Sequence, residues 1–204
     1  MSFNIGELFK AEEVVFKFQE IQSDISMSVK EIKSYWSRDY LDVKSYLTYA
    51  ERIAHTPLDK EGFGHWQGER GESKYMIEDP KLKKILEKYG VDGIEYKNGR
   101  PDFHPITEAT VYNPDENAFI PRNFSYADQQ CAKQWNECAR DGKTDWTERD
   151  VKSFRSEQEY TWHECSDMKT YQLVKREIHQ ECKHTGGVAE YKHKNNLVGG
   201  FDHE

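Results

Sequence analysis

Three of the eight histidines of this 204-residue chain, His163, His179 and His184, fall close together near its end. The carboxylate of Glu164 directly follows the first of them. Imidazole nitrogens and carboxylate oxygens are ligands for divalent cations. An ion held in this way, with positions open for water and phosphate, stabilises the charge that develops at phosphorus, while a nearby general base deprotonates water. These residue types therefore suit the hydrolysis of a phosphodiester bond.

The spacing of the two later histidines constrains the backbone between them. Residues from Lys175 to His184 are typical of a helix, which Gly186-Gly187 would end. On an ideal helix, two residues five apart are rotated by about 140°. His179 and His184 can therefore bind one ion only if the helix distorts or ends between them.

Two short strands are predicted before this helix. Tyr160 to His163 and Tyr171 to Val174 are rich in residues that favour strands. Strand, loop, strand and helix together make a ββα unit, which we expect at about residues 158–190. In such a unit the first strand and the helix can bring their histidines to one ion.

Two structural alternatives use the same segment. One is a zinc site that holds two elements together without catalysis, with the ligands His163, Cys165, Cys182 and His184. Their spacing does not match a zinc finger, and this site leaves Glu164 and His179 without a role. In the other alternative the histidines are hydrogen-bonded side chains without any metal, which is less expected for three in one polar segment.

The elements upstream predict an α+β protein. Apolar residues at steps of three and four from Phe9 to Ala54 indicate one or two amphipathic helices. The middle of the chain is mixed. Its predicted elements are a helix over 81–89 opened by Pro80, a strand, Asn-Gly turn and strand over 91–103, a helix over 126–139 with Cys131, Trp135 and Cys138 buried on one face, and a helix capped by Thr147 with Asp150 at its third position.

These elements give the expected domain organisation. A helical N-terminal region covers residues 1–55, and a second domain covers 56–204, with the mixed middle followed by the C-terminal ββα-metal unit. The polar tail after Val188 is expected to fray.

Composition narrows the class of protein. The net charge is −8, but residues 151–204 contribute only −1, and the stretch from Lys169 to Lys194 is locally basic. The acidic bulk therefore lies outside the candidate site, where it could repel nucleic acid or attract a basic partner. The four cysteines are too few and too scattered for a secreted disulfide scaffold. No apolar run is long enough to cross a membrane, and the first residues lack the features of a signal peptide.

One combination of motifs carries a family resemblance. The order and spacing of Thr161-Trp-His-Glu, Asp167-Met-Lys-Thr, Leu173-Val, Ile178-His and His184-Thr-Gly-Gly resemble the HNH/endonuclease VII superfamily. Within it, they are similar to the nuclease domains of colicin-like bacteriocins and bacterial polymorphic toxins. Weaker similarity to such toxins extends upstream over Gly64 to Gly71, Tyr89 to Tyr96, Pro101-Asp-Phe and Asp145-Trp-Thr.

The resemblance implies roles for several residues. His163, His179 and His184 would be metal ligands, and Glu164 stands where relatives usually have a histidine general base. The alternative is that His163 is the base and that Glu164 is a ligand or orients His163. Thr170 would brace the loop between the strands. Lys175 stands where relatives usually have proline, and Lys175 and Arg176 are candidate phosphate contacts, although both could equally be solvated helix charges.

The resemblance also implies a biological role. It implies an antibacterial toxin, delivered from the producing bacterium, that hydrolyses nucleic acid in the target-cell cytoplasm with one divalent ion (Zn, Ni, Mg or Mn). A cognate immunity protein would restrain it in the producer. DNA is favoured over RNA as the substrate, with a tRNA-cleaving toxin as the alternative. A different class of function is a non-catalytic interaction protein whose acidic, helical first part binds a partner.

Overall fold

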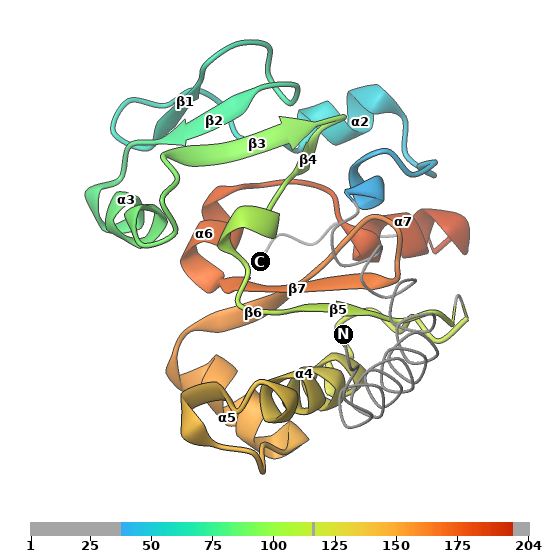
Figure 1. Cartoon of the computed structure of the whole chain (residues 1–204). Helices are drawn as coiled ribbons and strands as arrows, with labels where there is room; N and C mark the ends of the chain where they lie inside the picture. The colour runs from blue at the N-terminus through green and yellow to red at the C-terminus, as the bar shows by residue number, and fades with distance from the viewer. Residues whose placement is uncertain (1–37, 116, 198–204) are drawn as a thin grey trace, which may run out of the picture. The chain divides into compact units, whose positions relative to one another are not determined.

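Two antiparallel sheets organise the residues described by a computed structural model of the chain, which are 38–115 and 117–197 (Figure 1). The four-stranded sheet has the order β1-β2-β3-β4, with β1 Gly64–Trp66, β2 Lys74–Ile77, β3 Gly93–Lys97 and β4 Arg100–Pro101. The three-stranded sheet has the order β5-β7-β6, with β5 Thr110–Tyr112, β7 Thr170–Lys175 and β6 Tyr160–Glu164. Helices and sheets occur together, which confirms the predicted α+β class.

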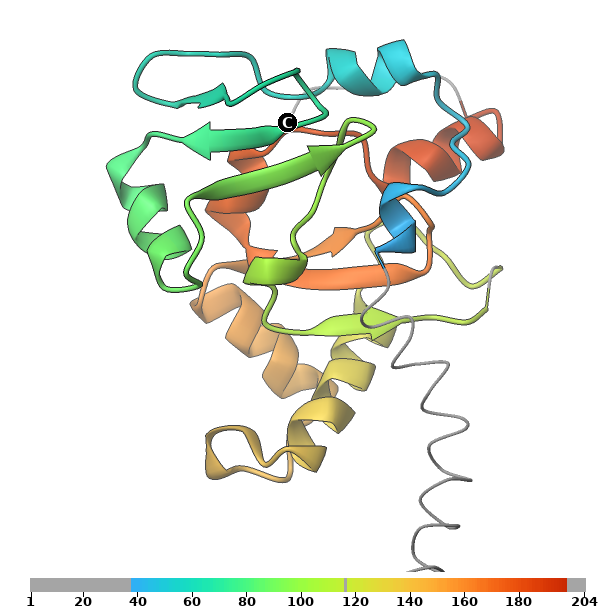
Figure 2. The ribbon, with the colours of Figure 1, turned by 45° about the horizontal axis from the view of Figure 1, so that its top comes forward.

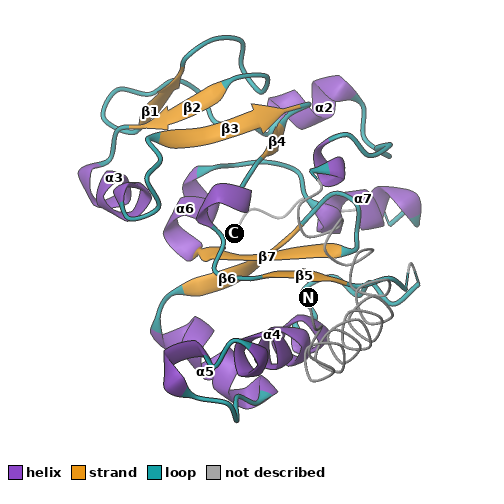
Figure 3. Cartoon of the chain, in the orientation of Figure 1, coloured by secondary structure: helices purple, strands orange, loops and turns teal. Residues whose placement is uncertain are grey.

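Helices separate and cover the two sheets (Figures 1 and 3). Between the sheets lie α6, Arg176–Glu181, and α7, Gly187–Lys194, while α4, Ser125–Glu137, and α5, Glu148–Glu157, cover the other face of the three-stranded sheet. The remaining helices are α2 Tyr49–Ala54, α3 Pro80–Glu87 and the 3-10 turns η1 Asp39–Leu41, η2 His104–Ile106 and η3 Arg140–Gly142. None of the helices in the described ranges is long and apolar enough to cross a membrane.

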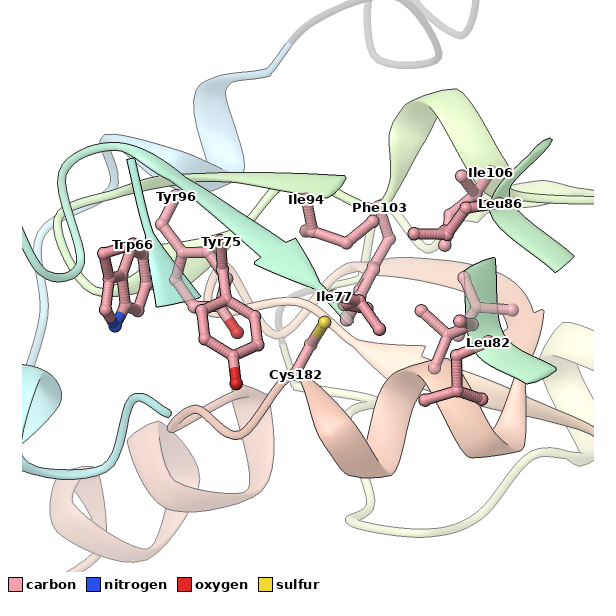
Figure 4. Close-up of a cluster of buried hydrophobic side chains, with 12 residues drawn as sticks. Trp66, Tyr75, Ile77, Leu82, Leu86, Ile94, Tyr96, Phe103, Ile106 and Cys182 are labelled. Atoms are coloured by element: carbon pink, nitrogen blue, oxygen red, sulfur yellow. The ribbon is translucent and has the colours of Figure 1, made fainter. Parts of the chain in front are cut away.

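Two large hydrophobic cores and a small cluster of Tyr40, Leu41 and Cys165 lie within the described residues. The first joins the four-stranded sheet and α3 to the C-terminal elements, and Figure 4 shows Cys182 and Phe103 among its buried side chains. The second lies between the three-stranded sheet and the α4–α5 pair, and it includes Trp135 and Trp162. Because β7 contributes Val174 to the first core and Leu173 to the second, the three-stranded sheet is buried on both faces.

Several local predictions are confirmed. Thr147 and Asp150 form the predicted capping box at the start of α5. Pro80 is the first residue of α3 and follows Asp79, whose side chain accepts from the first turn. The Asn98-Gly99 turn between β3 and β4 has positive φ at both residues, which this dipeptide tolerates best.

Other expectations need correction. Cys138 is exposed, although Cys131 is buried as expected, because α4 ends at Glu137 and Cys138 lies beyond it. The tail after Val188 does not fray at once, since α7 continues to Lys194 and buries Ala189 and Glu190.

The predicted helix from Phe9 to Ala54 falls mostly on residues outside the described ranges. In its described part a 3-10 turn, η1, is followed by turns and bends and then by the short helix α2, which Thr48 and Glu51 cap, so neither one nor two long helices reach Ala54 there. Residues from Arg38 onward group into one compact unit, and the predicted domain boundary after residue 55 stays a prediction.

Residues 38–48, here called the strap and drawn in blue in Figure 2, are held by buried charges. The Glu190 carboxylate on α7 accepts from the Ser45 hydroxyl at 2.6 Å and from the Tyr46 amide at 2.7 Å. Arg100 forms an ion pair with Glu190 at 3.3 Å and donates to the Leu41 carbonyl at 2.9 Å. These contacts explain why the strap packs with α7 and with β4.

A buried carboxylate joins the helical layer to β6. Asp128 on α4 accepts two hydrogen bonds from Arg155 on α5, at 2.7 and 2.6 Å. It also accepts from the indole nitrogen of Trp162 at 2.8 Å. Trp162 directly precedes His163, so this interaction fixes the position of β6.

Replacing Asp128 by alanine is expected to lower the free energy of unfolding by about 3–5 kcal/mol, because it leaves the Arg155 guanidinium without its buried partner. The measurement is urea denaturation. Asp145→Ala is the control, since the Asp145 side chain is 84% exposed and its loss should change stability by no more than about 0.5 kcal/mol. Equal effects of the two substitutions would contradict the structural role of Asp128.

Candidate metal centre

Strand β6 presents its side chains alternately to two faces of the three-stranded sheet. Trp162 packs in the core against α4 and α5. His163 therefore projects from the other face, where its ring lies 5.0 Å from the ring centroid of Phe103. The strand thus places one histidine in the layer that also contains α6.

The three predicted histidines come together in this layer. Nδ1 of His163 lies 3.3 Å from Nε2 of His179 and 3.1 Å from Nε2 of His184. One ligand atom from each ring can be chosen so that all three lie within 4.8 Å of one another. Three nitrogens at such distances can bind one ion and leave further positions open.

The end of α6 makes this convergence feasible. The helix spans Arg176–Glu181, so it ends between His179 and His184 and is shorter than the predicted helix to His184. Cys182 has φ −80° and ψ 66°, a non-helical conformation that redirects the chain before His184. The rotation of about 140° that a continuous helix would impose is thereby avoided.

The hydrogen bond of His184 selects its tautomer. Nδ1 of His184 lies 2.6 Å from the carbonyl oxygen of Cys182, which can only accept. Nδ1 therefore carries the proton, and the lone pair of Nε2 is directed toward the other two imidazoles. A backbone carbonyl that orients a metal-binding imidazole in this way is common in metal sites.

The surroundings keep the three imidazoles neutral. Burial lowers the pKa of His163 well below its usual range, and the neighbouring His184 and His179 lower it further. Burial likewise lowers the pKa of His179 to about 3 and that of His184 to about 4. The Phe103 ring contributes to this apolar environment, with centroids 5.7 Å from His179 and 5.8 Å from His184. Neutral imidazole is the form that binds a metal ion.

The donor set fits a divalent transition metal. Three neutral nitrogens suit Zn²⁺ or Ni²⁺ better than Mg²⁺, which prefers oxygen ligands. His163, His179 and His184 would hold the ion.

The structure does not assemble the alternative Cys2His2 set. Cys165 packs with Tyr40 and Leu41 of the strap, whereas Cys182 lies in the first core. Within the described ranges, the grouping of candidate metal ligands consists of the three histidines alone. The structural zinc alternative is therefore not supported.

Glu164 lies on the opposite side of β6 from the imidazoles. Its Oε1 accepts a hydrogen bond from the Arg122 amide at 2.9 Å, and its side chain is buried. Burial raises the pKa of this carboxyl to about 7, although the Arg122 amide and guanidinium act in the opposite direction. A carboxylate with such a pKa can exchange a proton near neutrality.

The remaining predicted site residues, Thr170, Lys175 and Arg176, contact nearby protein atoms and not the histidines. The Thr170 hydroxyl donates to Asp167 at 2.6 Å, within the turn that joins β6 to β7. Lys175 donates to the Gln158 carbonyl at 2.6 Å and lies over the Tyr160 ring. The exposed Arg176 lies at a weak 3.4 Å from the Tyr160 carbonyl. Lys175 has φ −58°, a value that proline also adopts, and α6 begins directly after it.

The Gly186-Gly187 pair allows the loop after α6 to approach β6 closely. A Cβ on Gly186 would lie 2.8 Å from the Glu164 carbonyl oxygen, and one on Gly187 would lie 2.6 Å from that of Cys165. Both contacts are closer than real Cβ atoms approach backbone. The two glycines therefore place His184 beside His163.

Sequence reasoning did not identify several residues around the centre. Phe103 lies in the Pro101-Asp-Phe segment that resembled the toxins, but nothing in its type pointed to the histidines. Arg122 has a positive φ of 62°, which is uncommon outside glycine, and no sequence signal marks it. Tyr40 and Gln172 also lie near the centre, and neither belongs to a recognised motif.

Comparison with known proteins agrees with the resemblance expected from the motifs. Residues 93–186 match the family described as the DNase/tRNase domain of colicin-like bacteriocin. This range contains the three histidines, Phe103 and Glu164. No curated protein and no solved structure matches the chain.

Substituting alanine for Gly187 is expected to lower the free energy of unfolding by about 1–3 kcal/mol, because the added Cβ meets backbone that must shift. The measurement is chemical denaturation. The control is Gly68→Ala, where the nearest atoms belong to the Ser73 side chain, at 3.3 Å from the added Cβ. A Gly187→Ala variant as stable as the wild type would show that the close approach is wrong.

The raised pKa of Glu164 predicts a pH-dependent stability. The unfolded carboxyl loses its proton near 4.5 and the folded one near 7, so the contribution to stability is complete below pH 4.5 and is lost as the pH rises to about 7. Glu164→Gln does not titrate and keeps an acceptor for the Arg122 amide.

In EDTA, the stability of Glu164→Gln relative to wild type should therefore rise by roughly 3 kcal/mol between pH 4.5 and pH 7 and then level off. Urea denaturation at several pH values measures this difference. A difference that does not change with pH would mean that Glu164 titrates normally.

Proposed function

We propose that the nuclease toxin domain formed by residues 93–186 is a metal-dependent HNH-type endonuclease whose favoured substrate is DNA. The observation that carries this proposal is the convergence of three neutral imidazoles on one point. Phosphodiester hydrolysis needs both charge stabilisation at phosphorus and a proton acceptor for water. The centre offers groups for both tasks.

The histidines supply the ligands. Nδ1 of His163 faces the other two rings, so His163 suits a ligand better than a general base. A divalent ion held there would polarise the phosphate and stabilise the leaving oxygen. The Cys182 carbonyl holds the His184 ring in the orientation that this task requires.

The motif offers two candidate general bases, His163 and Glu164. With His163 as a ligand, Glu164 is the remaining candidate. Its pKa of about 7 suits a base that works near neutrality, and the Arg122 amide fixes its carboxylate. The carboxylate leaves β6 on the face away from the imidazoles. It would therefore have to act around the end of β6, where the backbone carbonyl of Glu164, and not its carboxylate, borders Gly186.

The biological role rests on the family. A toxin domain of this kind would be delivered into a competing bacterium and act on nucleic acid in its cytoplasm, with a cognate immunity protein as partner in the producer. The second candidate is tRNA cleavage, because the matched family includes both DNases and tRNases. Lys175 is a weaker candidate for a phosphate contact, since its side chain would first have to leave the Gln158 carbonyl.

Cleavage assays with plasmid DNA and with tRNA test the function, each with Mg²⁺, Mn²⁺, Ni²⁺ or Zn²⁺ and with EDTA. We expect the wild type to cleave DNA with at least one of these ions and EDTA to abolish cleavage. His163→Ala should lose both ion binding and cleavage, because a ligand is removed. Glu164→Gln should still bind the ion but cleave about 10²- to 10⁴-fold more slowly, because the proton acceptor is removed.

The matched control is His65→Ala, which removes an exposed histidine paired with Glu78 on the surface. It should bind the ion and cleave like the wild type. Absence of cleavage of either substrate with every ion would refute the enzymatic function. If the protein cleaves tRNA and not DNA, tRNA is the substrate. If Glu164→Gln cleaves as fast as the wild type, the general base is another residue.

A further inference from the structure

A buried hydrogen-bonded chain runs from the strap to the histidine centre. The Tyr40 hydroxyl donates to Oδ1 of Asp102 at 2.8 Å and accepts from Nε2 of Gln172 at 3.0 Å. All three side chains are almost fully buried. Burial raises the pKa of Tyr40, and the nearby Cys165 and Asp102 raise it further, so the phenol stays protonated as a donor.

One end of this chain lies next to His163. Gln172 on β7 is directly opposite His163 on β6, and directly opposed residues in antiparallel strands project from the same face. Oε1 of Gln172 is buried without a hydrogen-bond partner. The amide of Gln172 is thus held by Tyr40 through its nitrogen, and its oxygen is buried without a partner on the face of the sheet that also carries His163.

The other end lies next to Phe103. Asp102 precedes Phe103, and its Oδ1 also accepts from the backbone amide of His104 at 3.1 Å. Its Oδ2 forms an ion pair with Arg38 of the strap at 3.0 Å. These contacts fix the turn that presents the Phe103 ring to all three imidazoles.

We propose that Tyr40 is a positioning residue of the histidine centre, which it serves by tying Gln172, the strand neighbour of His163, to the turn that carries Phe103. The proposal rests on the proposed metal-dependent function. Tyr40 lies outside residues 93–186, so the segment that matches the family is completed in this chain by a residue from the strap. A side chain that supports metal ligands from behind commonly changes ion affinity by about 10- to 100-fold when removed.

Tyr40→Phe tests this role because it removes the hydroxyl and keeps the ring. Calorimetric titration with Ni²⁺ or Zn²⁺ alone is expected to show affinity weakened by about 10- to 100-fold. The matched control is Tyr160→Phe. Tyr160 is also buried, its hydroxyl also donates to a carboxylate, that of Glu108 at 3.0 Å, and its side chain packs on the other face of β6.

The control should bind the ion like the wild type. Wild-type affinity in Tyr40→Phe, or equal weakening in both variants, would overturn the proposal, because the hydroxyl would then have no specific effect on the centre.

A second variant guards against failure of Tyr40→Phe to fold. Gln172→Met keeps the length of the side chain and removes the amide, so it should weaken ion affinity in the same way. If Tyr40 acts through Gln172, the variant with both substitutions should bind the ion only slightly more weakly than the single variant with the lower affinity. Fully additive losses, or wild-type affinity in Gln172→Met, would overturn the link.

A metal-independent measurement separates this proposal from the proposed function. In EDTA, the imidazole ¹⁵N resonances of His163, His179 and His184 should shift in Tyr40→Phe and stay in place in Tyr160→Phe. Failure of the wild type to bind any ion would refute the metal-dependent function. The positioning role would then be tested by these resonances alone. A shift in Tyr40→Phe would support it, and unchanged resonances would overturn it.

Discussion

The packing of three imidazole rings against Phe103, one of them buried and two half-buried, constrains the whole domain, because polar rings are tolerated inside a protein only when they are neutral and their nitrogens have partners. Here the nitrogens of His163, His179 and His184 face one another, and the Cys182 carbonyl accepts from one of them. The packing therefore favours the protonation state that metal binding requires. Positive charge brought by an ion would be compensated elsewhere, by its remaining ligands or by a phosphate.

Strand β6 divides the domain into two chemical environments. One face carries His163 into the imidazole layer. The other face carries Trp162 to the buried Asp128–Arg155 pair, and Glu164 to the Arg122 amide. Because adjacent residues of a strand project from opposite faces, the Trp-His-Glu motif anchors the strand, supplies a candidate metal ligand and supplies a carboxylate at three separate places. A shift of register by one residue would exchange these environments and destroy the centre.

Local signals in the sequence were sufficient for several elements and for the grouping of the three histidines, but they did not predict β1, β2 or α7. The Thr147 capping box, the Asn98-Gly99 turn and the histidine spacing each depend on neighbours in the chain, and the structure retains them. The sequence did not predict where α6 ends. It showed only that the helix must distort or end between His179 and His184 if both bind one ion. Contacts between distant segments gave no signal: the bond from Gln172 to Tyr40 spans 132 positions, and the one from Arg122 to Glu164 spans 42. Such pairs depend on tertiary packing, which residue type and periodicity do not specify.

The family match and the stable unit differ in extent, and the buried ion pair of Arg100 with Glu190 shows why. Arg100 lies within residues 93–186, whereas Glu190 lies on α7 beyond them. Side-chain exposures of 4% and 0% leave neither charge in water. A chain cut at residue 186 would leave the Arg100 guanidinium buried without its carboxylate, a loss of about 3–5 kcal/mol. It would also release Ser45 and Tyr46, and with them the strap that carries Tyr40. The centre therefore depends on a folded unit that begins at Arg38 and includes α7.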